Sequence, residues 1–185
     1  QDVVTLAQLS LTLVEQQACS SSRFQFIEAT VEQADRYCAL LREKMGVERP
    51  FCTAEGRPLP DDLRDEVEGL RGMDAFYRVW GDYAGAGVVI RSEDPVEFHP
   101  DGRIVNVVVV PDLTDALQYV NLATQTVGVY PPSRKAELRN ALACAGVQRV
   151  VDLGNAGAVE RGLPHDGFYP LQRFMRWVND EGGEQ

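Results

Sequence analysis

The chain has 185 residues, 44% hydrophobic and 25% charged, which is enough for one packed domain and excludes disordered and fibrous classes. Its formal net charge of −10 repels phosphate backbones, so we expect no nucleic-acid partner. No apolar run approaches the roughly 18–20 residues that a membrane helix needs, so we expect no membrane span.

The first half of the chain predicts helices and short strands in alternation. We predict helices over residues 2–17, 31–45 and 60–70, and strands over residues 24–28 and 88–90. Asp2 is placed to cap the first helix, and Thr30 with Gln33 forms a capping-box pattern at the start of the second. Gly46 ends that second helix.

The second half predicts strand, helix, strand, helix, strand. The strands cover residues 103–110, 124–130 and 147–153, and the helices cover residues 112–122 and 133–145, with a last amphipathic helix over 170–178. Nearly continuous valines in the first of these strands indicate burial on both faces. The alternation predicts an α/β fold with a mainly parallel sheet and helices on both faces. We expect one domain over residues 1–178 and a flexible tail over 179–185.

The cysteines and histidines do not form a metal-site pattern. The four cysteines include no C-x-x-C pair, and the only histidines are His99 and His165, so we expect no metal site. A disulfide framework is not expected for a chain of this size and apolar content, which favours the reducing cytoplasm. The chain begins with Gln1 and no leader-like segment follows, which fits either excision from a larger protein or processing of the chain.

The sharpest chemical signal is the segment from Gln16 to Arg23, which lies where an apolar helix gives way to a strand. A cysteine at such a junction, here Cys19, is exposed on a rigid support, which suits a thiolate nucleophile. Arg23 is a nearby cation, and the hydroxyl of Ser20 and its serine neighbours can donate hydrogen bonds. Two points oppose this interpretation: the C-terminal end of a helix dipole disfavours a thiolate, and free cysteines are usually buried packing residues.

Two further segments have both a functional and a structural interpretation. His165 lies between Pro164 and Gly167, which restricts its backbone and suits a positioned general base or a hydrogen-bond donor to a carbonyl. The same residues also fit a simple turn in which Asp166 caps the next helix. Gly128, inside a predicted strand, indicates close approach of a backbone or a ligand, or a packing glycine beneath a helix.

Three segments in order resemble one enzyme family. Residues 17–23 resemble the nucleophile motif of the long-chain fatty acyl-CoA reductases of bacterial bioluminescence, which belong to the aldehyde dehydrogenase superfamily. Residues 124–130 resemble the family's L-Q-T-V-G-I segment, and residues 164–178 resemble its C-terminal H-D-G…R-W-V end. The resemblance implies that residues 1–178 form an aldehyde dehydrogenase-like catalytic domain. The N-terminal cofactor-binding domain of the family is then absent from this chain.

The resemblance also implies a reaction. Cys19 attacks an acyl thioester, carried by CoA or by a carrier protein, and forms an acyl-enzyme. A hydride from NAD(P)H, NADPH in this family, then reduces it to an aldehyde. His165 lies at the mouth of the active site with a catalytic role, and the substrate is contacted by Ser20, Arg23, Thr126, Val127, Asp166 and Gly167. The expected partners are the cofactor domain of the same enzyme and an acyl-transferring protein. The isolated chain is therefore not expected to reduce acyl-CoA.

Two other functions remain open from the sequence. One is a non-catalytic aldehyde dehydrogenase-like domain that serves binding or oligomerisation. The other is a thioesterase or acyltransferase in which His165 activates Cys19, which requires the two side chains within hydrogen-bonding reach. Every enzymatic interpretation requires that Cys19 be open to solvent or substrate.

Overall fold

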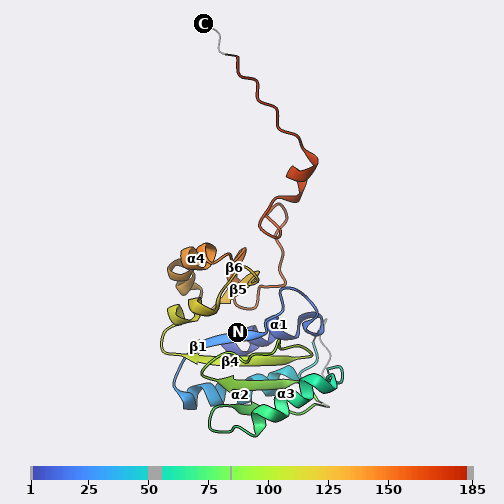
Figure 1. Ribbon diagram of the computed structural model, residues 1–185, viewed down its shortest axis with the longest axis vertical. Helices are drawn as coiled ribbons and strands as arrows, with labels where there is room; N and C mark the ends of the chain where they lie inside the picture. Colours follow the sequence, from blue (N-terminus) through green and yellow to red (C-terminus); the bar gives the residue numbers. More distant parts are fainter. Residues whose placement is uncertain (1, 50–55, 84, 183–185) are drawn as a thin grey trace.

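The central feature of the computed structural model, which describes residues 2–49, 56–83 and 85–182, is a four-stranded sheet (Figure 1). Its strands are β1 (Phe24–Glu28), β2 (Arg78–Trp80), β3 (Val88–Ser92) and β4 (Ile104–Val110), in the order β1-β4-β3-β2. The β1–β4 and β3–β4 pairs are parallel, and β2 pairs with β3 in the antiparallel direction. The predicted mainly parallel sheet is therefore confirmed.

Helices cover both faces of this sheet, as predicted. The helices are α1 (Val3–Thr12), α2 (Val31–Met45) and α3 (Asp61–Arg71). Alternate residues of β3 and β4 point to opposite faces: Val89 and Val105 pack in the cluster with α1 and α2, whereas Ile90 and Ile104 pack with α3. The valine-rich strand β4 is buried on both faces for this reason. Within the described residues, every helix falls short of the length and apolarity that a bilayer crossing needs.

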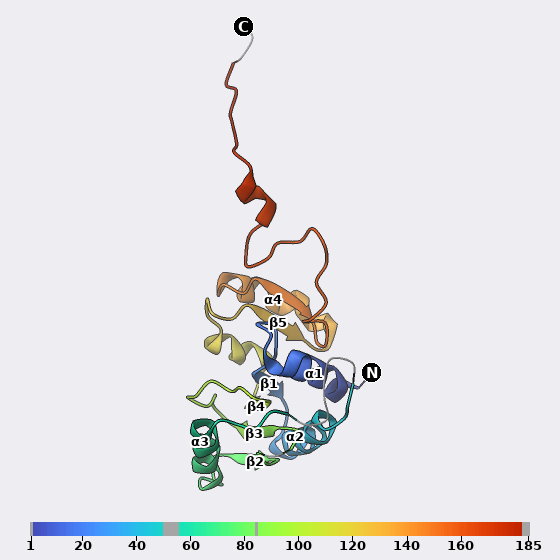
Figure 2. The same ribbon diagram turned by 90° about the vertical axis from the view of Figure 1, so that its right-hand side faces the viewer.

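A second, smaller unit lies beyond the β1 edge of the sheet (Figures 1 and 2). It contains the short 3-10 helices η2 (Leu113–Tyr119) and η3 (Pro132–Arg134), the helix α4 (Lys135–Cys144), and the parallel pair β5 (Thr126–Val129) and β6 (Arg149–Asp152). Its own core consists of Val129, Leu138, Leu142 and Val147. The strands predicted after residue 103 therefore belong to two sheets, since β4 pairs with β1 and β3 whereas β5 pairs with β6.

Several predicted elements differ in the structure. The helix predicted over residues 2–17 ends at Thr12 and is followed by the 3-10 turn η1 (Leu13–Gln16). Its residues Val14, Glu15 and Gln16 all have a positive φ, a conformation that costs about 1–2 kcal/mol per residue for L-amino acids. The element predicted over residues 112–122 is the 3-10 helix η2, and the three-residue edge strand β2 was not predicted because it is too short to show a period.

The segment after the second unit leaves the body of the molecule (Figures 1 and 2). All residues from 157 to 182 are exposed. The amphipathic helix predicted over residues 170–178 is wrong: the structure has a single 3-10 turn, η4 (Pro170–Phe174), with no buried side chain. Its apolar residues follow a helical pattern but have no surface of the described chain to pack against, and packing is what stabilises most short helices.

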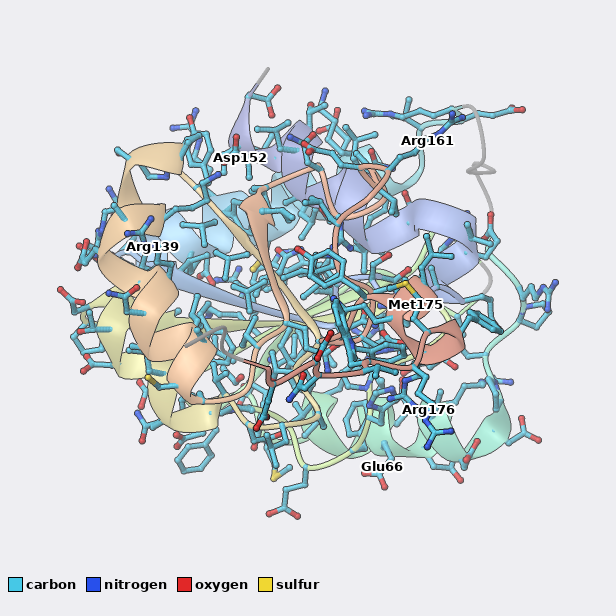
Figure 3. The ribbon with its side chains drawn as sticks, turned by 90° about the horizontal axis from the view of Figure 1, so that it is seen from above. Glu66, Arg139, Asp152, Arg161, Met175 and Arg176 are labelled. Atoms are coloured by element: carbon cyan, nitrogen blue, oxygen red, sulfur yellow. The ribbon has the colours of Figure 1, made fainter. Side chains whose placement is uncertain are left out.

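We expect trypsin to cut this exposed segment before it cuts helix α4. Arg161 and Arg176 lie in the exposed segment, whereas Arg139, which is also exposed, lies in the hydrogen-bonded helix α4 (Figure 3). Limited proteolysis followed by mass spectrometry should therefore show cleavage after Arg161 and Arg176 while the peptide containing Arg139 stays intact. Cleavage after Arg139 at a comparable rate would contradict this assignment.

Candidate active site

Cys19 lies in a tight turn between η1 and β1. The backbone N–H of Ser21 donates to the carbonyl of Ala18 at 3.0 Å, which closes the turn around the cysteine. The N–H of Ser22 donates to the carbonyl of Ser10 at 2.9 Å and ties the turn to α1. The thiol of Cys19 is free and exposed. The turn therefore presents the sulfur on a supported backbone, as a nucleophile requires.

A cavity of about 1150 Å³ opens beside this turn, between the β1 edge and the β5–β6 unit. Five of the predicted site residues line it together: Cys19, Ser20, Arg23, Thr126 and Val127. The first three come from the loop before β1 and the last two from β5, so the fold brings together segments more than 100 positions apart. Most of the other lining side chains are apolar, and the volume lies somewhat above the roughly 300–1,000 Å³ typical of ligand pockets.

An aromatic pair forms part of the cavity wall. The rings of Phe26, on β1, and Tyr119, on η2, stack with their centroids 5.4 Å apart. The hydroxyl of Tyr119 donates to Asp94 Oδ1 at 2.7 Å, and this hydrogen bond raises the pKa of the tyrosine. Gly128 on β5 also lines the cavity, and a Cβ there would lie 3.4 Å from Leu153 Cα. This is an ordinary van der Waals distance, so the close approach of a backbone or a ligand predicted at Gly128 stays a prediction.

Arg23 holds the loop that carries Cys19. Its Nη1 donates to the carbonyl of Pro100 at 2.5 Å and to Asp101 Oδ1 at 3.1 Å, and its Nη2 donates to the carbonyl of Gln16 at 3.2 Å. Burial opposes ionisation of Asp101, but the N–H of Gly102 and the Arg23 guanidinium outweigh it and lower the pKa of the carboxyl below its ordinary value of 3.8. The guanidinium is thus engaged with the protein itself.

The Asp101 carboxyl should contribute a small acid-dependent part of the stability. Because it binds a proton more weakly in the folded than in the unfolded chain, its contribution is complete above pH 4 and is lost as pH falls through the lowered pKa. The side chain is 42% exposed, so screening keeps the effect below about 1 kcal/mol. Denaturant unfolding between pH 3 and 6 should show that the free energy of unfolding falls less steeply with decreasing pH for Asp101→Asn than for the native chain. The matched variant Asp74→Asn, at an exposed loop position, should leave the slope unchanged.

Beneath the loop lies a buried polar group that the sequence did not reveal. The side chains of Gln16 and Arg103 are essentially fully buried, and Arg103 Nη2 pairs with Glu15 Oε2 at 2.6 Å. Neither residue belongs to a local motif that predicts burial, and their contacts join positions almost 90 residues apart. The nearest signal was the run of polar residues just before Cys19, which interrupts the apolar helix pattern.

The segment around His165 lies outside the cavity lining. His165 and Phe168 exchange backbone hydrogen bonds of 2.9 and 3.1 Å, with Asp166 and Gly167 at positive φ between them. Asp166 does not cap a helix; its carboxylate contacts His165 Nδ1 at 3.0 Å and accepts from Gln125 Nε2 at 2.7 Å. In the described part of the chain no hydrogen bond joins His165 to Cys19, so the arrangement that a Cys–His thioesterase or acyltransferase needs is not present.

The starts of the α-helices do not suit the phosphates of a dinucleotide. A pyrophosphate is usually held by the free N–H groups at a helix N-terminus, where a negative side chain opposes it. Each of the four α-helices carries an acidic side chain at its start or in its first turn, and the one at α2 is already closed by the Thr30–Gln33 capping box. These helix starts therefore do not fit the phosphates of a nicotinamide cofactor.

Comparison with known proteins identifies the relationship. Residues 3–177 match the model of the family described as acyl-CoA reductase (LuxC). The long-chain acyl-protein thioester reductase of Vibrio harveyi is 28% identical over 169 residues, which is 90% of this chain and 35% of that protein. The enzyme of the same name from Photorhabdus luminescens is 35% identical over 96 residues, 51% of this chain and 20% of that protein. The chain thus spans about a third of the length of the first of these relatives.

Solved structures support the fold. A salicylaldehyde dehydrogenase from Pseudomonas putida G7 superposes with a TM-score of 0.63 at 17% identity, covering 91% of this chain and 40% of that one. An NADP-dependent glyceraldehyde-3-phosphate dehydrogenase from Bacillus halodurans C-125 superposes with a TM-score of 0.58 at 15% identity, and the match covers 87% of this chain and 37% of that one. These likenesses show an aldehyde dehydrogenase fold, as expected from the sequence. Because the family model matches almost the whole chain, the chain belongs to the acyl-CoA reductase (LuxC) family.

Proposed function

We propose that this chain is the thioester-accepting portion of an acyl-thioester reductase, with Cys19 as the nucleophile. The observation that carries the proposal is the exposed thiol of Cys19 on a supported turn that lines a mostly apolar cavity. An apolar cavity suits an acyl chain, because burial of each CH₂ group contributes about 0.8 kcal/mol. Family membership supports the same function, and the relatives' names specify a long-chain acyl thioester.

The proposed step is thioester exchange. The Cys19 thiolate attacks the acyl carbonyl, a new carbon–sulfur bond forms, and the thiolate of CoA or of the carrier leaves and takes up a proton. One thioester replaces another, so the step is close to thermoneutral. Among the described residues, the N–H groups of Cys19 and Ser20 donate no backbone hydrogen bond, which leaves them available to the developing oxyanion. The hydroxyl of Ser20, which also lines the cavity, is a further donor.

We propose that the hydride and the acyl group are both supplied by partners outside the described residues. We propose that NADPH supplies the hydride and is held by a separate cofactor domain of the same enzyme, which the acidic helix starts described above support. An acyl-transferring partner protein remains the proposed donor where the acyl group is protein-bound. The three described cysteines are free, which supports the reducing cytoplasm as the proposed compartment.

The proposal places the substrate near the residues of both cavity walls. Thr126 and Val127 on β5, and Ser20 and Arg23 before β1, are proposed to contact the acyl thioester, because all four line the same cavity. His165, Asp166 and Gly167 are proposed to contact the substrate only where it leaves the cavity, since Asp166 is hydrogen-bonded to Gln125, a residue of the cavity lining.

Intact-mass spectrometry tests this function directly. The chain is incubated with dodecanoyl-CoA, and a mass increase equal to one dodecanoyl group is expected, removable by hydroxylamine, as thioesters are. Peptide mapping should place the group on Cys19. A chain that remains unmodified, or that carries the acyl group elsewhere, would refute the proposed function.

A further inference from the structure

The side chain of Gln16 joins the two ends of the loop that carries Cys19. Gln16 is fully buried, and its Nε2 donates to the carbonyl of Ser22 at 2.9 Å and to the carbonyl of Ile104 at 2.8 Å. Its Oε1 accepts from the backbone N–H of Arg103 at 2.7 Å. The amide orientation is fixed by these partners, because two carbonyls face the nitrogen and an N–H faces the oxygen.

The partners of the Gln16 amide lie at the end of the loop and at the start of β4. Gln16 and Ser22 are the two ends of the loop, and Cys19 lies at its midpoint, three residues from each. Arg103 and Ile104 stand at the start of the buried strand β4. The amide therefore ties both ends of the loop to each other and to a strand that is buried on both faces. All three partners are backbone groups, so the amide acts on the course of the main chain directly.

The backbone of Gln16 is held in a conformation that few residues adopt without support. Its φ is 62°, and it follows two further residues with positive φ, Val14 and Glu15. The carbonyl of Gln16 accepts from Arg23 Nη2 at 3.2 Å, so the same residue is fixed through its side chain and its main chain. Strain of this kind persists where the surroundings over-determine the conformation, which is common beside reacting groups.

We infer that Gln16 is a positioning residue, which orients Cys19 for attack on a cavity-bound thioester without touching the substrate itself. The inference rests on the proposed function, since it assumes that Cys19 is the nucleophile. Orientation affects the reaction of a bound substrate strongly, because a displacement of about 1 Å can cost on the order of 100-fold in rate. A small reagent that approaches from solvent has no such requirement.

Acylation and alkylation of Cys19 together distinguish a loss of positioning from a loss of structure in the loop. Gln16→Met keeps the length of the side chain and removes all three hydrogen bonds. At saturating dodecanoyl-CoA we expect acylation to slow by about 10- to 100-fold, with a nearly unchanged half-saturating concentration, while alkylation by iodoacetamide stays within about 3-fold of the native rate. The matched control is Gln8→Met: Gln8 is equally buried, and its Nε2 donates to Thr12 Oγ1 at 2.6 Å on its own helix. The Gln8→Met variant should be acylated and alkylated at rates close to those of the native chain.

The possible results test the positioning role of Gln16 separately from the acylation of Cys19. If native chain is acylated on Cys19 and Gln16→Met is acylated as fast as Gln8→Met, the positioning role is overturned and the proposed function stands. Equal slowing of acylation and alkylation would also overturn it, because the loop would then have lost its structure altogether. Failure of the native chain to become acylated on Cys19 would refute both.

A second variant serves if Gln16→Met gives no cooperative unfolding transition. Gln16→Glu has the same shape, and its protonated carboxyl can donate to one of the two carbonyls, whereas the ionised form faces both with negative charge. Burial raises the pKa of such a carboxyl. The acylation rate of the variant relative to native chain should therefore fall as pH rises from 5 to 8. A ratio that stays near one across this range would overturn the inference.

Discussion

Cys19→Ala should abolish the acyl adduct, with a fall in acylation rate of at least about 1,000-fold, because the serine hydroxyls that also line the cavity are far weaker nucleophiles than a thiolate unless a base activates them. The reaction is followed by intact mass at several times and acyl-CoA concentrations. The substitution removes one exposed sulfur atom and leaves the hydrogen bonds of Ser21 and Ser22 in place, so thermal unfolding should shift little.

A second exposed cysteine supplies the control for this experiment. Cys144, at the end of α4, is free and exposed like Cys19 but does not line the cavity. Cys144→Ala should therefore be acylated on Cys19 at the native rate. Acyl transfer to Cys144 in the native chain, at a rate comparable with that of Cys19, would indicate unselective thiol reactivity and contradict the assigned nucleophile.

Asn106→Ala should destabilise the fold by about 3 kcal/mol. Asn106 is fully buried on β4; its Nδ2 donates to the Ile90 carbonyl at 3.1 Å and to Ser92 Oγ at 2.8 Å, and its Oδ1 accepts from the Val96 N–H at 3.0 Å. Removal of the amide leaves these buried groups without their partner, each at a cost of about 1–3 kcal/mol if no other partner is found. Denaturant unfolding measures the change.

The same asparagine connects the sheet with the site. Its backbone N–H donates to the carbonyl of Arg23 at 3.0 Å, and its side chain fixes Val96 in the loop that leads to Pro100 and Asp101, the partners of Arg23. Asn155→Ala, at an exposed loop position, is the control and should change the free energy of unfolding by less than about 0.5 kcal/mol. An Asn106→Ala variant as stable as this control would show that the buried amide is not a main support of the fold.

Local signals predicted individual elements well. The strand at Phe24–Glu28 has the predicted bounds, and the Thr30–Gln33 capping box is present with both of its hydrogen bonds. Gly46 ends α2 as predicted, and its N–H donates to the carbonyl of Glu43 at 3.2 Å. These features depend on neighbouring residues alone. The division into two sheets depends on which distant strands pair, and periodicity carries no information on that choice.

Sequence motifs predicted the site residues that depend on neighbouring positions. They did not predict the contacts that depend on the tertiary structure. Cys19 stands out because it follows a break in an apolar helix pattern, and the structure leaves it exposed in a cavity. Arg23 was expected to influence the thiol, but its guanidinium is directed to Gln16, Pro100 and Asp101. The contact between Gln16 and β4 crosses 88 positions, and glutamine in a polar run gives no sign of burial. The role predicted for His165 stays a prediction.

The two walls of the cavity belong to different hydrogen-bonded ladders, since Phe26 lies on β1 and Val127 lies on β5. No shared ladder sets the width of the space between them. The smaller unit is held against the larger sheet by other contacts, among them the Arg134–Glu28 ion pair at 3.1 Å and the hydrogen bond from the Gly154 N–H to Ser10 Oγ at 3.2 Å. The width of the cavity therefore depends on contacts between side chains, whereas the turn that carries the sulfur is tied to the larger sheet through the amide of Gln16.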